Sequence, residues 1–137
     1  MNRHYDEEII RLFVHKDRKE RYLFKLAHAD RRSEVVAALH GQIEFDPQCC
    51  TALPHSVGSE HLCTLLKDRG AGKNAYMMSN NAELDGCILP LLDALQGCVG
   101  STIGTIVYCF EGRVGYYESN DAGCCLLHRA NVLHQKK

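Results

Sequence analysis

The pattern of apolar and polar residues changes near residue 41. Before that point the chain is charged and rich in helix formers, and from residue 41 onward come all 11 Gly and all three Pro. Gly and Pro are unfavourable inside helices, whereas turns use both. We therefore expect a helical segment over residues 5–40, a mixed segment of helices and strands over 41–129, and a frayed tail over 130–137.

Three helices are predicted in the first segment. Residues 5–14 carry apolar side chains at helical spacing, and residues 16–28 repeat the pattern, either as a second helix or as a continuation of the first. Asp30 is expected to cap a third helix that runs through Leu39, with Gly41 just past its end. The expected inward positions are Ile9, Ile10 and Phe13, then Tyr22, Leu23, Leu26 and Ala27, and then Val35, Val36 and Leu39.

The second segment begins with a predicted loop over 42–58 that has room for one short strand. A fourth helix is expected from Ser59, as its N-cap, to residue 69, and a strand over 74–79. Pro90 suits the first turn of a short helix that ends near Gly97. Its inward positions would be Leu91, Leu92 and Leu95.

The last third of the chain reads most clearly as strands. Residues 102–110 are β-branched and aromatic, and residues 113–118 follow after a Glu111-Gly112 turn, which predicts a hairpin. A third strand is expected over 124–129. Together these elements predict a single α+β domain spanning residues 1–137. Its N-terminal helices would pack on one face of a small, mainly antiparallel sheet that ends in a C-terminal strand meander.

Charge and cysteine content narrow the compartment and the chemistry. Sixteen Lys and Arg against seventeen Asp and Glu give a net charge of -1, so no whole-chain field favours nucleic acid or membranes. Acids at positions 6–8 do not suit a signal peptide, and no apolar run is long enough for a membrane span. The eight cysteines contain no C-x-x-C pair, which favours reduced, buried thiols in a cytoplasmic protein. A zinc site or a regulatory thiol is the alternative.

A local excess of positive charge lies between residues 15 and 32, where seven Lys and Arg stand against three acids. Such a helix face could neutralise phosphates or meet an acidic protein, and Tyr22 and Phe24 could stack on bases if they are exposed. A solvated helix face over a core stripe is the structural alternative. The candidate residues for this face are Lys16, Arg18, Lys19, Arg21, Lys25, Arg31 and Arg32.

The other candidate site is the polar loop at residues 79–86. We expect Ser79, Asn80, Glu83 and Asp85 to be available to a small ligand, because functional polar groups concentrate on loops. A hydrolase-like site formed by Glu83, Asp85 and His55 is one interpretation. A nucleophile pair of Cys63 with His55 or His61 is disfavoured, because Cys63 lies among leucines.

Two Gly-rich segments resemble anion-binding loops without matching one. Residues 70–73 lack the spacing and the hydroxyl residue of a phosphate-binding loop. Residues 97–105 lack dinucleotide spacing, although their backbone N–H groups could hold an anion. No catalytic motif is present, so the sequence predicts no catalytic residue, metal ligand or cofactor.

Three stretches, Ala75–Ser79, Leu84–Gly86 and Gly104–Glu118, resemble a family of small bacterial proteins of uncharacterised function. Those proteins also open with a basic helical stretch similar to residues 16–32. The resemblance covers about residues 15–129 and implies a cytosolic bacterial protein with no reaction or active-site residue attached. This chain departs from it at Glu111, where the family would have Pro before the turn glycine.

These observations favour a small cytoplasmic binding or regulatory module that uses its basic helical face on a protein or nucleic-acid partner. The alternatives are a hydrolase-like enzyme at the Asn80–Asp85 loop and a thiol or zinc protein.

Overall fold

The structure is a computed structural model, and it describes residues 2–54, 57–121 and 123–129. The predicted tail and His55 lie outside this range. Five α-helices are present in the described chain: α1 (Arg3–Phe13), α2 (Lys16–Leu26), α3 (Arg32–Ala37), α4 (Ser59–Asp68) and α5 (Leu91–Cys98). Three short 3₁₀ helices accompany them: η1 (Ala29–Arg31), η2 (Ala38–His40) and η3 (Pro47–Cys49).

Six strands form one sheet in the order β1-β6-β5-β4-β2-β3, and every pairing is antiparallel. The strands are β1 (Cys50–Ala52), β2 (Asn74–Ser79), β3 (Ile88–Pro90), β4 (Thr105–Cys109), β5 (Val114–Ser119) and β6 (Gly123–Leu127). The α+β class, the antiparallel sheet and the C-terminal meander β4-β5-β6 are thereby confirmed. The strand predicted over 74–79 has the predicted bounds.

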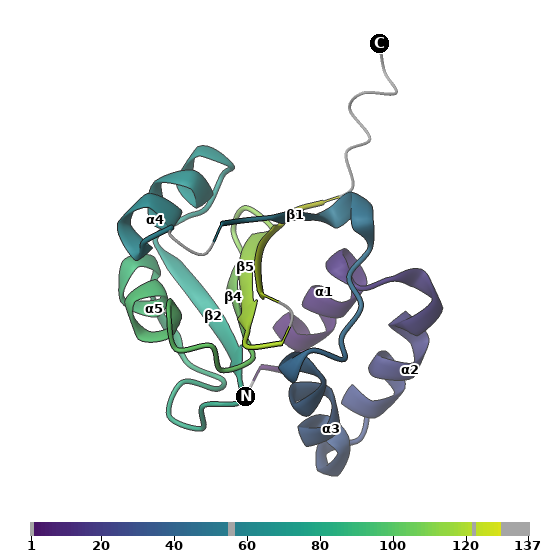
Figure 1. Cartoon of the computed structure of the whole chain (residues 1–137). Coiled ribbons are helices and arrows are strands. Elements are labelled where there is room, and N and C mark those ends of the chain that lie inside the picture. The colour runs from purple at the N-terminus through teal and green to yellow at the C-terminus, as the bar shows by residue number, and fades with distance from the viewer. Residues whose placement is uncertain (1, 55–56, 122, 130–137) are drawn as a thin grey trace.

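The N-terminal helices cover one face of the sheet, as predicted, but α4 and α5 cover the other face, so the helices are not confined to one side (Figure 1). The helices of the first forty residues pack against one face, where Tyr76, Tyr108 and Tyr117 point. Helices α4 and α5 pack against the other face, which carries Met77 and Val107. Because successive side chains alternate between the faces, all five residues of β4 are buried.

Local boundaries differ from the prediction where capping chemistry was misassigned. The helix expected from Asp30 to Leu39 is a short α-helix between two 3₁₀ turns, and Asp30 lies inside the first turn rather than capping it. Gly58, not Ser59, is the N-cap of α4. Leu92 is only half-buried, since the inward stripe of α5 runs through Leu91, Ala94, Leu95 and Cys98.

Two further differences concern the strands. The short strand β3 was not predicted, and it pairs with β2 at the sheet edge. The β4–β5 connection spans residues 110–113 instead of two residues, and Arg113 adopts a positive φ of 56°. The tip of this connection lies against the turn at residues 70–72. The approach is so close that a Cβ on Gly112 would lie 2.3 Å from the Gly70 carbonyl oxygen. The absence of a side chain at Gly112 therefore permits a close backbone contact with Gly70.

Candidate functional site

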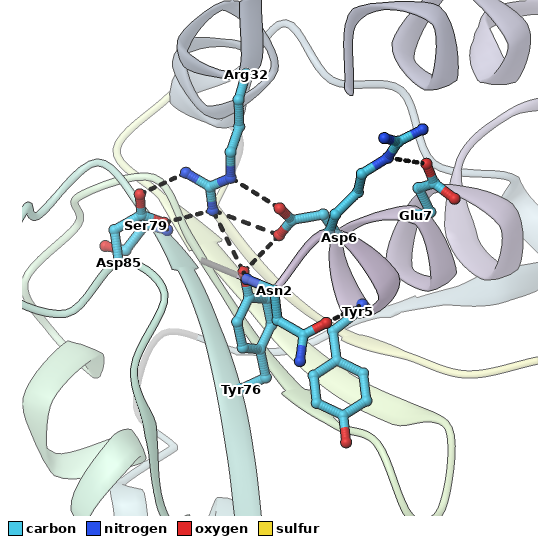
Figure 2. A network of polar contacts seen from close by, with 9 residues as sticks. Asn2, Tyr5, Asp6, Glu7, Arg32, Tyr76, Ser79 and Asp85 are labelled. Carbon is cyan, nitrogen blue, oxygen red and sulfur yellow. Dashed lines mark hydrogen bonds and ion pairs between the residues drawn. The ribbon is translucent and has the colours of Figure 1, made fainter. Parts of the chain in front are cut away.

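The guanidinium of Arg32 connects the N-terminal helix to the sheet (Figure 2). Its Nε donates to Asp6 Oδ2 at 2.8 Å, while Nη1 and Nη2 donate to Asp85 Oδ2 and Oδ1 at 2.6 and 2.9 Å. Asp6 is 1% exposed and the Arg32 side chain 14%. Burial opposes the charge of Arg32, but hydrogen bonds to Asp85 and Asp6 outweigh it and raise the pKa of the guanidinium. Arg32 is therefore held as a cation inside the fold.

Tyr76 of β2 completes this network from beneath. Its hydroxyl donates to Asp6 Oδ1 at 2.7 Å and accepts from the backbone N–H of Asn2 at 3.2 Å (Figure 2). Burial and the bond to Asp6 raise the pKa of Tyr76, so the phenol stays protonated. Helix α1, the start of α3 and the loop after β2 are thus joined by one set of polar side chains.

The polar loop predicted as a ligand site supplies part of this internal framework. Asp85 holds Arg32 and also accepts the backbone N–H of Ser79 at 3.0 Å. Ser79 is buried, and its hydroxyl lies 2.7 Å from the hydroxyl of Thr105. The amide of Asn80 donates to the carbonyls of Val36 and Gly104 at 2.9 and 3.2 Å.

Glu83 is the one of the four predicted loop residues whose side chain is exposed. The loop therefore fastens α3 to the sheet through Ser79, Asn80 and Asp85. The hydrolase-like interpretation requires Glu83 and Asp85 to act together. In the structure, Asp85 is bound to Arg32, whereas Glu83 faces solvent.

The basic residues of α2 behave differently from Arg32, because they lie at the surface. Arg18 pairs with Glu44 at 2.9 Å and Lys25 with Glu34 at 3.2 Å, both with exposed acids. Arg31 pairs with the same Glu34 at 3.2 Å. Among the described residues, Lys16, Lys19 and Arg21 take part in no ion pair within 4.0 Å. Of the seven predicted basic residues, Arg32 alone belongs to the buried network, and Arg18, Arg21 and Lys25 share one face of α2.

A surface hollow of about 400 Å³ opens between α2 and the segment α3–η2. Arg18, Arg21 and Lys25 line it from α2, and Glu34 lines it from α3. The side chain of Tyr22, which is 8% exposed, also lines the hollow and belongs to the core below it. The hollow therefore has three cations and one carboxylate around a largely buried aromatic ring.

Phe24, on the same helix, has 56% of its surface exposed. The His28 ring lies 4.6 Å from the Phe24 ring, and Arg31 Cζ lies 5.9 Å from the Phe24 ring centroid. Positions 21, 24 and 25 share one face of α2 at three and four spacing, and His28 follows just after the end of the helix. We call the surface formed by Arg18, Arg21, Phe24, Lys25, His28 and Arg31 the α2 patch. Of the two aromatics in the basic stretch, only Phe24 is accessible for stacking.

The cysteines are all free thiols. Cys49, Cys98, Cys109 and Cys125 are buried, and the other four are half-buried. In the part of the chain that the structure describes, no group of three or more His, Cys, Asp and Glu side chains could hold a metal ion. Cys63 is half-buried on α4 and His61 is exposed two positions earlier.

Comparisons with known proteins add no relative. No family model matches the sequence, and no curated protein or solved structure is significantly similar to it. None of the helices in the described residues has the length and apolar character needed to cross a membrane. The assignment of function therefore rests on the geometry of this chain.

Proposed function

We propose that this protein is a binding module for single-stranded nucleic acid and that the α2 patch is its binding surface. The observation that carries the proposal is the exposed ring of Phe24, which lies against His28 and Arg31 on the helix that also bears Arg21 and Lys25. Proteins that bind single strands combine cations along the backbone path with aromatic rings on which bases stack. A base would stack on Phe24, while Arg18, Arg21 and Lys25 would meet the phosphates.

The ion pairs of the patch do not oppose this role. Arg18, Lys25 and Arg31 pair with exposed carboxylates, and solvent screens such surface pairs so that they contribute little to stability. A phosphate can replace Glu44 or Glu34 at little cost, and Arg21 pairs with no acid among the described residues. The net charge of -1 limits attraction to this local surface, so affinity should be modest and strongly dependent on salt.

The remaining expectations belong to the same proposal. A cytoplasmic location fits the eight free thiols, since reducing compartments keep cysteines unpaired. A bacterial origin, which the resemblance of the sheet strands implies, stays a prediction. Residues 1–137 would act as one unit, because the helices of the first forty residues and the sheet share a core.

The test is fluorescence anisotropy with a labelled pyrimidine oligonucleotide at 50 and 200 mM salt. The triple variant Arg18→Gln, Arg21→Gln, Lys25→Gln should bind more weakly. The magnitude of its slope of log affinity against log salt should fall by roughly 2, because each of the three lost phosphate contacts contributes about 0.7. The matched control, Lys67→Gln, Arg69→Gln, Lys73→Gln, removes the same charge from exposed positions near α4 and should retain the parent slope.

Two results would overturn the proposal. One is the absence of binding by the parent protein at 50 mM salt. The other is an equal loss in both triple variants, which would mean that only net charge matters. If polyglutamate competes as well as the oligonucleotide, the patch belongs to an acidic protein partner instead.

A further inference from the structure

A second pocket lies on the opposite face of the sheet from α2, where the loop after α5 meets the end of β5. Its volume is about 350 Å³. The loop residues Gly100 and Thr102, the strand residues Tyr116 and Glu118, and the aliphatic side chains of Val57 and Val99 line it. Tyr116 belongs to the core cluster formed with α4 and α5.

The carboxylate of Glu118 is the charged group of this pocket, and the residue is only 5% exposed. Its Oε1 accepts from the Tyr116 hydroxyl at 2.6 Å and from Gly100 N–H at 3.2 Å, while Oε2 accepts from Thr102 N–H at 2.7 Å. These bonds hold Thr102 at a positive φ of 58°. The loop whose backbone N–H groups could hold an anion thus binds the Glu118 carboxylate of the chain itself.

Every one of these three donors is neutral. Burial and the bond to Glu118 raise the pKa of Tyr116, so the phenol remains a protonated donor. No Lys, Arg or His is among the described residues that line the pocket. A carboxylate can accept about four hydrogen bonds, so Oε2 retains a position that these bonds do not use. Neutral donors therefore hold the carboxylate in place, but none of the described lining residues supplies a cation, so an added positive charge would gain a strong attraction at this buried position.

We propose that this pocket binds a small organic cation, an alkylammonium whose N–H group donates to Glu118. The ammonium meets the Glu118 carboxylate and the hydroxyl oxygen of Tyr116, and the hydrocarbon part of the ligand lies against Val57 and Val99. Ligand pockets typically have volumes from about 300 Å³ upward, with apolar walls and few polar groups. The pocket provides that combination, with one negative charge at its base.

An organic cation suits this pocket better than a metal ion. Metal ions require several ligands, and no group of three or more His, Cys, Asp and Glu side chains converges within the described residues. An alkylammonium needs one strong acceptor and apolar walls, and both are present. This inference is independent of the α2 patch, which shares no lining residue with the pocket.

Isothermal titration of the full chain with n-butylammonium chloride tests the proposal. n-Butanol is the neutral match in shape, and KCl and CaCl₂ are the inorganic cations. We expect butylammonium to bind at least tenfold more tightly than butanol and either salt. Glu118→Gln should reduce butylammonium affinity at least tenfold, while Glu111→Gln, an exposed carboxylate at the other end of the β4–β5 hairpin, should leave it within twofold.

Because Glu118→Gln changes the bonds to the loop, a second variant separates binding from folding. Val99→Phe fills the pocket and leaves the carboxylate in place, so it should abolish butylammonium binding while its circular dichroism stays that of the parent. Equal affinity for butanol and butylammonium would overturn the proposal. So would binding of calcium alone, or unchanged affinity in a folded Glu118→Gln protein.

Discussion

Arg32 binds Asp85 through two nitrogens, with distances of 2.6 and 2.9 Å, and this pair joins the start of α3 to the loop after β2. Its third contact, to the buried Asp6, brings in α1. Bidentate arginine–carboxylate pairs of this kind are geometrically specific as well as strong. The N-terminal helices are therefore fixed to the sheet by a defined polar contact in addition to apolar packing.

Replacing Arg32 by Met should destabilise the protein by about 3–5 kcal/mol, because Asp6 would be left buried without its cation. Urea unfolding at pH 7 measures this loss. Arg31→Met is the matched control, because Arg31 pairs with Glu34 at the exposed surface, where solvent screens the pair, so this variant should unfold close to the parent midpoint. Similar losses in the two variants would mean that the buried network adds nothing to stability.

Replacing Phe24 by Ala should weaken oligonucleotide binding by about 5- to 150-fold, the range expected for the loss of one stacked base at about 1–3 kcal/mol. The salt slope should stay at the parent value, because no cation is removed. Phe24→Tyr keeps a stacking ring and should bind within about threefold of the parent. Anisotropy titrations at two salt concentrations measure both quantities. Unchanged affinity in Phe24→Ala would remove Phe24 from the binding surface.

Stability should decrease above pH 9 in part because of Cys98. Burial raises the pKa of this thiol from 9.0 to about 12 in the folded protein. Between pH 9 and pH 12 the Cys98 thiol has lost its proton in the unfolded chain and has kept it in the folded chain. The stability that this protonated thiol contributes is therefore complete below pH 9 and is lost as pH rises toward 12. The slope for one such group approaches about 1.4 kcal/mol per pH unit.

Urea unfolding at pH 8, 9 and 10 with a reductant measures this dependence. Cys98→Ala should lower stability at pH 8 but show a shallower decrease toward pH 10. Leu95→Ala removes a buried apolar side chain from the same helix and should keep the parent slope. If both variants retain the parent slope, ionisation of Cys98 does not contribute.

Gly104→Ala should destabilise the protein by about 1–3 kcal/mol, the usual cost of overpacking a close contact. A Cβ at this position would lie 2.4 Å from the Leu39 carbonyl oxygen and 2.9 Å from Asn80 Nδ2. Gly58→Ala is the control, because a Cβ at Gly58 would meet nothing within 4 Å, and its effect should stay within about 1 kcal/mol. Thermal unfolding compares the two variants, and equal midpoints would contradict the close approach.

The sequence was informative wherever local pattern determines structure. β-Branched and aromatic residues located β4, the strand predicted over 74–79 coincides with β2, and Pro90 located the start of α5. The uninterrupted apolar run of β4 also carried a signal that was not used, because a strand buried on both faces does not alternate. The three-residue strand β3 is too short for any periodicity and depends on pairing with β2.

The candidate sites depended on contacts that local pattern does not encode. A polar loop at residues 79–86 is typical of an exposed site, but the partner of Asp85 lies 53 positions away at Arg32. Arg32 was grouped with the surface cations for the same reason. Helical spacing could have distinguished Phe24 from Tyr22, since residues two apart point to different faces. Glu118 gave no signal, because its partners Gly100 and Thr102 come from a distant loop.

The sheet ends on each side in a strand of only three residues, β1 and β3. Long, flat edge strands can pair with strands of other molecules, whereas short or proline-containing edge strands disfavour such pairing. Pro90 lacks the N–H that an added strand would need, and β1 shields the longer β6. These two short strands therefore disfavour strand pairing between molecules. Removing β1 would leave the backbone N–H and C=O groups of β6 unpaired on that edge and so promote fibril-like association.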